Sequence, residues 1–152
     1  MHCLYFVILT KEEDSTSLDA RKDAQSTLIQ ENFCQEGFFG GGKGDWFVIG
    51  GRWSGVFSWT LLGLNPMKKK GFKKSWKKAG IKTPIPYIRS VHEYDGYEDD
   101  AMILDKKLWE ALVKKYPDVE LYDADNYDER FLRDFEEKEL LGRWIIAIDY
   151  HG

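Results

Sequence analysis

Apolar residues gather into two runs, one near each end of the chain, that predict central β-strands. The first covers residues 3–10 and the second residues 143–150, and both are apolar at nearly every position instead of at alternate ones. Strands with two apolar faces are typical of the interior of a sheet. We expect the two to lie side by side, which would bring His2, Asp149 and His151 to one sheet edge in a polar structural role.

Helical periodicity is clearest between residues 105 and 116. Apolar side chains recur there with the spacing of one buried helix face, and an aspartate precedes them as the N-terminal cap. The cap is Asp105 and the face comprises Leu108, Trp109, Leu112, Val113 and Tyr116. Two further helices are predicted over residues 17–33, capped by Thr16 or Ser17 and burying Ala20, Ala24 and Leu28, and over residues 127–141.

Shorter apolar segments complete the predicted sheet. Strands are expected at residues 45–49, 53–59 and 101–104, with the pair Gly50-Gly51 as a kink between the first two. Strand, helix and strand therefore recur in each half of the chain. This order favours an α+β fold with a single mixed or antiparallel sheet and helices packed on one face, as in a ferredoxin-like or related two-half β-α-β sandwich. A chain of 152 residues is of the usual size for one domain, so residues 1–152 are expected to form one.

Amino-acid composition indicates the cellular compartment of the protein more clearly than its function. Cys3 and Cys34 have no zinc-site spacing and are too few for a disulfide framework, which indicates a reducing compartment. The apolar start lacks a basic leader and a cleavage site, and no apolar run reaches the roughly 20 residues that span a bilayer. We expect a cytoplasmic protein without membrane contact. Aromatic residues make up 15% of the chain, which suggests that some rings lie at the surface or in a pocket.

A basic segment separates the two halves. Residues 66–92 contain nine Lys or Arg and no Asp or Glu, and prolines bound the lysine-rich part, which predicts an insertion over residues 66–86. Phe72 and Trp76 stand four residues apart and would share one face of a short helix. Lysines contact phosphates and aromatic rings stack on bases, so this is a candidate nucleic-acid site. Its residues are Lys69, Lys73, Lys74, Trp76 and Lys77. The alternative is a solvated lysine loop.

The stretch from residue 40 to residue 55 is the most unusual in the chain, because it is rich in glycine and also carries Trp, Lys and Arg. Glycine lets a backbone approach a ligand and present N–H groups to an anion, while basic side chains neutralise charge and Trp rings stack. These features predict a site for a nucleotide-like anion or a protein partner, lined by Lys43, Trp46, Arg52, Trp53 and Ser54. Neither common nucleotide-loop pattern is present. The structural alternative buries both Trp rings and pairs Arg52 with Asp45 or Asp149.

Motifs for metal binding and catalysis are missing from the sequence. The acidic stretches 93–100 and 123–129 do not follow a calcium-loop pattern and are expected to be solvated loops or a surface for a basic partner. The histidines show no metal-ligand or phosphoester spacing. We therefore predict no metal and no cofactor. An enzymatic alternative, a small phosphoesterase or nuclease, would require Asp45, Asp149 and His151 to converge in one pocket.

The segment Asp45–Gly55, with residues 100–104 and a tail of pattern W-x5-Y-H over Trp144–His151, resembles a group of uncharacterised small proteins of phages and mobile elements. The resemblance implies a setting in which small proteins inhibit host defences in the host cytoplasm, by capturing signalling nucleotides or occupying nucleic-acid-binding surfaces. We therefore expect a non-enzymatic binding protein for a nucleotide-like molecule or a host protein. Nucleic-acid binding and phosphoester hydrolysis are the alternatives, and self-association is left open.

Overall fold

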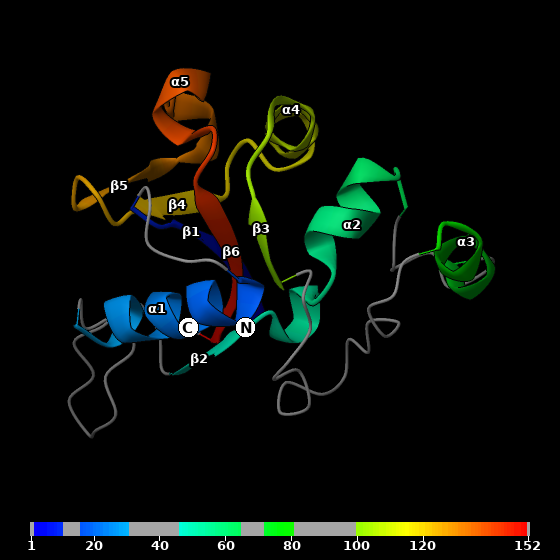
Figure 1. Ribbon diagram of the computed structural model, residues 1–152, viewed down its shortest axis with the longest axis horizontal. Helices are drawn as coiled ribbons and strands as arrows, with labels where there is room; N and C mark the ends of the chain where they lie inside the picture. Colours follow the sequence, from blue (N-terminus) through cyan, green and yellow to red (C-terminus); the bar gives the residue numbers. More distant parts are fainter. Residues whose placement is uncertain (1, 11–15, 31–45, 65–71, 81–99, 152) are drawn as a thin grey trace.

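The computed structural model describes residues 2–10, 16–30, 46–64, 72–80 and 100–151. They form β1 (His2–Ile8), α1 (Ser17–Gln30), β2 (Trp46–Ile49), the 3-10 helix η1 (Gly51–Trp53), α2 (Val56–Leu61), α3 (Phe72–Lys78), β3 (Ala101–Ile103), α4 (Lys106–Lys115), β4 (Glu120–Asp123), β5 (Asp128–Phe131), the 3-10 helix η3 (Leu132–Asp134), α5 (Glu137–Leu140) and β6 (Trp144–His151) (Figure 1). No helix within these ranges is long and apolar enough to cross a bilayer.

One mixed sheet organises the described part of the chain. Its strand order is β2-β6-β1-β4-β5, and β3 also pairs with β6. The central pair β1 and β6 is antiparallel, with His2 opposite His151 and Ile8 opposite Ile145, whereas β1 and β4 are parallel. The predicted α+β fold with a single sheet is confirmed, and so is the pairing of the two apolar end strands at its centre.

Helices cover both faces of this sheet, so the prediction of helices on one face was wrong. Along β1 the side chains alternate, with Phe6 and Ile8 in one apolar cluster and Tyr5 and Val7 in the other. The first cluster is completed by α2 and α4 and the second by α1, which crosses the sheet in Figure 1. Both faces of the central strands are apolar, and each therefore has to be covered to exclude water.

The two most regular predicted helices are present with their caps. In α4, the Asp105 carboxylate accepts a hydrogen bond from the Leu108 N–H at 2.8 Å. The expected apolar face packs on the core, with Leu108, Trp109 and Leu112 buried and Val113 and Tyr116 partly buried. In α1, the Thr16 hydroxyl accepts from the Asp19 N–H at 3.1 Å. Ala20, Ala24 and Leu28 are its buried apolar residues, as predicted. Residues 31–33, where this helix was expected to continue, lie outside the described residues.

The predicted strand over residues 53–59 is instead a helical segment. Gly51 and Gly55 have φ angles of 53° and 82°, values that L side chains rarely adopt, and these turns end the extended conformation after Ile49. The chain then forms η1 and α2, and α2 buries Val56 and Phe57 in the core. A segment of six residues with four apolar side chains fits a short strand and a short helix almost equally well, which explains the error.

The predicted helix over residues 127–141 was also wrong. A turn at Tyr127, with φ of 53°, reverses the chain so that β5 pairs antiparallel with β4, a strand that was not expected. Only Glu137–Leu140 is α-helical, and the side chains of Glu136 and Glu139 cap it reciprocally. The apolar side chains of this region that were expected on one helix face instead belong to a strand, a 3-10 helix and a short α-helix.

A buried guanidinium joins four of these elements just before β6. Arg143 donates from Nε to the Leu9 carbonyl at 2.6 Å, from one terminal nitrogen to the Glu139 carbonyl at 3.0 Å and from the other to the Asp123 carboxylate at 2.5 Å. Both charged side chains are almost fully buried, so the prediction of a solvated loop fails at Asp123. Burial raises the pKa of Asp123, but hydrogen bonds from Arg143 and Asn126 outweigh it and hold that pKa below its ordinary value. The pair therefore stabilises the fold above the ordinary carboxyl pKa, and this contribution is lost as pH falls through the lowered value.

Replacing Arg143 by Met should destabilise the protein strongly, because the Asp123 carboxylate would stay buried without its cation. We expect a loss of about 3–5 kcal/mol in the free energy of unfolding, measured by urea denaturation at neutral pH. Arg133→Met is the control, since Arg133 is exposed and pairs with Asp118 at the surface, and should cost no more than about 1 kcal/mol. Equal losses in the two variants would contradict the assigned role of Arg143.

Candidate functional site

The pair Gly50-Gly51 turns the chain directly over two buried carboxylates. Asp100 and Asp149 are both 0% exposed. A Cβ at Gly50 would lie 2.4 Å from the carboxylate of Asp100, and a Cβ at Gly51 would lie 2.6 Å from that of Asp149. Both glycines also have positive φ angles. No other residue fits here, because any side chain would collide with a buried charge.

Asp149 is held by the turn and by the start of β1. One carboxylate oxygen accepts the backbone N–H of Arg52 at 2.9 Å, and the other lies 2.9 Å from Nδ1 of His2. The anion at this turn therefore belongs to the protein itself. The backbone of this glycine-rich stretch was expected to present N–H groups to a ligand, but the N–H of Arg52 binds Asp149 instead.

Asp100 performs the same task on the other side of the turn. Its carboxylate accepts a hydrogen bond from the Ser54 hydroxyl at 2.9 Å and a longer one from the Gly55 N–H at 3.4 Å. Ser54 is fully buried, so this predicted ligand-binding residue is part of the support of the turn. Asp100 was expected in a solvated acidic stretch, and that prediction is wrong at this residue; positions 93–99 lie outside the described residues.

The remaining predicted site residues differ in how far they are exposed and in whether the structure describes them. The Arg52 side chain is exposed, and within the described residues its guanidinium makes no ion pair. Trp53 is half-buried and packs against the core cluster that contains α2 and α4. The backbone of Trp46 pairs with His151 in the sheet, whereas its side chain, Lys43 and Asp45 lie outside what the structure describes.

Two histidines meet at the end of the central strand pair, as the sequence predicted. His2 and His151 are opposite each other in the register of β1 and β6, and their rings contact edge to face with centroids 5.7 Å apart. Asp149 accepts the hydrogen bond of His2, which assigns the proton to Nδ1 and orients the ring. With Arg52 joined to the same carboxylate through its backbone, three basic side chains belong to residues gathered around Asp149.

The lysine-rich insertion contains the predicted short helix, α3. Phe72 and Trp76 lie on one face of it with ring centroids 5.6 Å apart. Trp76 is only 1% exposed, so its ring cannot stack on a base as expected from the sequence. Lys73, Lys74 and Lys77 can still contact phosphates at the outer side of the helix, while Lys69 lies outside the described residues.

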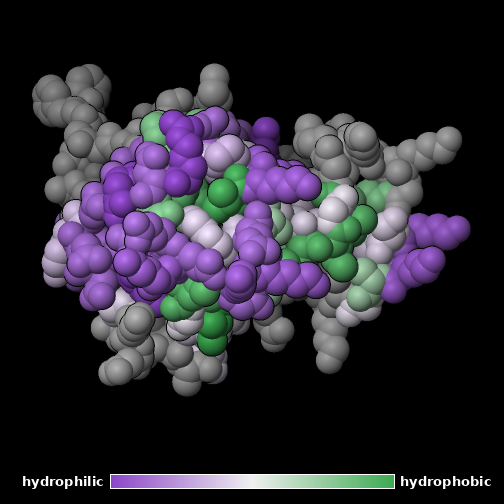
Figure 2. All heavy atoms as spheres, turned by 90° about the horizontal axis from the view of Figure 1, so that it is seen from above, coloured by the Kyte–Doolittle hydropathy of each residue, from purple (hydrophilic) through white to green (hydrophobic). Residues whose placement is uncertain are grey.

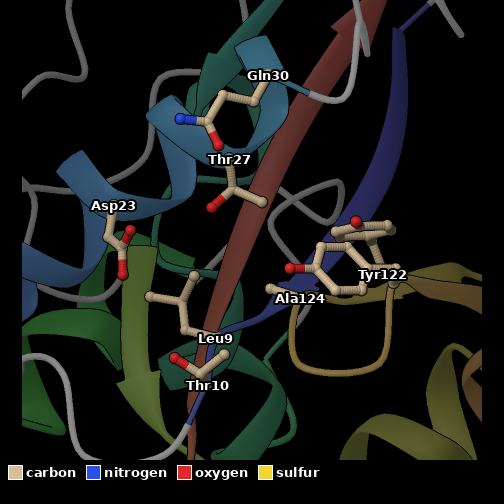
Figure 3. Close-up of a pocket in the computed structure, with 8 residues that line it drawn as sticks. Leu9, Thr10, Asp23, Thr27, Gln30, Tyr122 and Ala124 are labelled. Carbon is tan, nitrogen blue, oxygen red and sulfur yellow. The ribbon is translucent and has the colours of Figure 1, made fainter.

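A pocket that sequence reasoning missed lies where the parallel strands β1 and β4 end (Figure 3). Its volume is about 120 Å³, and it is lined by Leu9, Thr10, Asp23, Thr27, Gln30, Tyr122, Ala124 and Tyr127. The carboxyl ends of parallel strands are common ligand sites in α/β sheets. The one available signal was the row of polar residues at 23, 27 and 30, which share a helix face.

A second depression lies between α2 and α4 and is largely apolar. Thr60, Leu61, Gly63, Ala111, Lys114 and Lys115 line it. Figure 2 shows hydrophobic atoms reaching the surface among hydrophilic side chains on the side of the molecule where these helices lie. The groove offers few polar groups to orient a ligand. Among the described residues, no group of three or more His, Cys, Asp or Glu is arranged to hold a metal ion.

Comparisons with protein-family models, with curated proteins and with solved structures find no match to this chain.

Gly51→Ala should test how closely the turn depends on the buried carboxylate. The variant combines a positive φ, which costs an L residue about 1–2 kcal/mol, with a clash that adds about 1–3 kcal/mol. Gly63→Ala is the matched control, because Gly63 has φ of 67° but a Cβ added there would meet no atom within 4 Å. Urea denaturation should therefore show a clearly larger loss for Gly51→Ala. Similar losses would mean that Asp149 does not restrict this position.

Proposed function

We propose that this protein binds a small phosphate-bearing anion, of the nucleotide class, at the sheet end formed by His2, His151 and Arg52. The observation that carries the proposal is the carboxylate at their centre. Asp149 is fully buried, and both of its oxygens are engaged by the Arg52 backbone and by His2. It anchors the backbone of Arg52 and the ring of His2 while its own charge stays away from solvent.

The balance of charge at this end favours an anion. Arg52 carries a guanidinium, and His2 and His151 add two imidazoles that can donate hydrogen bonds, so three basic residues belong to the end of the strands where Asp149 is buried. Hydrogen bonds from cations to phosphate oxygens are among the strongest in proteins, and a guanidinium can make two in parallel. The half-buried ring of Trp53 follows Arg52 directly and is a candidate stacking surface for a base.

The basic residues and the Trp53 ring favour nucleotides as a class of ligand, without a preference for one nucleotide. The inhibitory role implied by the resemblance to phage proteins has no support from the comparisons. Binding through the lysines of α3 has a weaker basis than the sequence suggested, because Trp76 is buried in the core and offers no stacking surface.

Arg52→Ala should abolish stabilisation by nucleotides. The substitution keeps the backbone N–H that binds Asp149 and removes only the exposed guanidinium, so the fold should persist. At a ligand concentration about 100-fold above Kd, wild type should gain about 2.7 kcal/mol, which raises Tm by about 5–10 °C in a chain of this size. The measurement is thermal melting with a panel of linear and cyclic nucleotides and inorganic phosphate.

Two control variants separate this site from other basic surfaces. Arg133→Ala removes an exposed arginine elsewhere, and the double variant Lys73→Ala/Lys77→Ala removes two lysines of α3; both should keep the nucleotide shift. The nucleotide shift should also be smaller in His151→Asn than in wild type, because this variant lacks one imidazole of the proposed site. A flat panel, or an equal shift in Arg52→Ala, would refute the proposal.

A second candidate, phosphoester hydrolysis, is favoured by the hydrogen bond between His2 and Asp149. A buried carboxylate that orients an imidazole is an arrangement typical of a general acid or base, and Arg52 would bind the phosphoryl group. Wild type should then hydrolyse an activated phosphodiester, and His2→Gln should reduce turnover by about 100-fold or more. Stabilisation by nucleotides without any turnover would leave binding as the function.

A further inference from the structure

The pocket at the ends of β1 and β4 is separate from the proposed anion site. His2 begins β1, whereas Leu9 and Thr10 follow its end, so the length of the strand lies between the two places. They also belong to opposite faces. His2 shares its strand face with Phe6 and Ile8, which α2 and α4 cover, and the pocket is lined by α1, which covers the other face. One small ligand cannot occupy both.

Polar groups for recognition come from two sides of the pocket. Thr27 and Gln30 project from α1 toward the strand ends, and Leu9 and Thr10 close the pocket at the end of β1 (Figure 3). The Thr10 hydroxyl is buried and has no hydrogen-bond partner among the described residues. A buried hydroxyl without a partner is costly, and a ligand that bonds to it recovers that cost.

Aromatic rings complete the lining opposite α1. Tyr122 is buried at the end of β4, and Tyr127 is 77% exposed in the turn that follows. Tyr127 is the sole non-glycine residue of the described chain with a positive φ. Such a conformation persists only where the surroundings enforce it and often marks a functional site.

The turn that carries Tyr127 is fixed by the buried ion pair. Asp123 accepts hydrogen bonds from the Asp125 N–H and from the Asn126 side chain, both at 2.9 Å, while Arg143 binds the same carboxylate. The turn that carries the exposed ring is therefore anchored to a buried ion pair.

Size and charge select the ligand class. A volume of about 120 Å³ holds about four water molecules, which is room for a single small ring but not for a nucleotide. Among the described residues that line the pocket there is no Lys or Arg, and Asp23 contributes negative charge, so a phosphate or carboxylate is disfavoured. Hydroxyl and amide side chains facing tyrosine rings suit a flat, neutral molecule with donors and acceptors on its edge.

We propose that this pocket binds a neutral single-ring nucleobase, a pyrimidine, by stacking at Tyr127 and by hydrogen bonds to Thr10, Thr27 and Gln30. The site is independent of the anion site, and neither proposal requires the other.

The test is a titration of the full chain with free uracil and free cytosine, followed by two-dimensional amide NMR. Saturable shifts are expected at the amides of Thr27 and Ala124. Adenine, with two rings, should bind more weakly. Benzene tests for a merely apolar cavity and inorganic phosphate for an anion site, and neither should shift these amides.

Variants tie the binding to the named groups. Thr10→Val keeps the shape of the side chain and removes the hydroxyl, and it should weaken pyrimidine binding at least tenfold without lowering Tm. Tyr127→Ala and Gln30→Ala should weaken binding similarly. Gln25→Ala, an exposed residue of α1 that does not line the pocket, is the matched control and should bind as wild type.

Specific outcomes overturn the proposal. They are no saturable shift up to the solubility limit of the pyrimidines, benzene binding as tightly as uracil, or unchanged affinity in folded Thr10→Val and Gln30→Ala. Arg52→Ala should bind pyrimidine bases normally, so failure at one site is distinguishable from failure at the other.

Discussion

The structure depends on the buried guanidinium of Arg143. Its guanidinium reaches the carbonyl after β1, the carboxylate at the end of β4 and the carbonyl of Glu139 in α5, immediately before the central strand β6 begins. The buried guanidinium is tolerated only because the Asp123 carboxylate neutralises its charge and two carbonyl oxygens accept hydrogen bonds from its other nitrogens. Asp123 needs Arg143 in the same way. Three separate parts of the chain must therefore come together before either charged side chain can be buried.

A buried anion, the Asp149 carboxylate, lies near the other end of β6. Asp149 is held by a backbone N–H and by His2, and the double glycine lies so close to it that no side chain fits between them. The apolar middle of β6 thus separates a buried cation from a buried anion. Each charge organises the loops around it, and each of the two candidate ligand sites forms beside one of them.

The glycine-rich segment shows why a composition can point to the right place for the wrong reason. Glycines, a basic residue and aromatic rings suggested a cradle for a ligand, and the turn does bind an anion. That anion is the Asp149 carboxylate, and Ser54 likewise serves Asp100. What the turn leaves for a ligand is the exposed side chain of Arg52. A ligand at this turn would have to be bound by side chains, because the backbone N–H groups of Arg52 and Gly55 already bind Asp149 and Asp100.

The sequence by itself determined the elements whose pattern is long and regular. The helix over residues 105–116 was predictable from its long periodic apolar face, and the end strands from their length and nearly continuous apolar character. The meeting of His2 with His151 followed from that strand pairing. Only the tertiary structure decided that the short run after Gly55 is helical and that Asp123 is buried. A six-residue segment takes the conformation that its packing allows, and a carboxylate is buried only where a distant partner such as Arg143 compensates its charge.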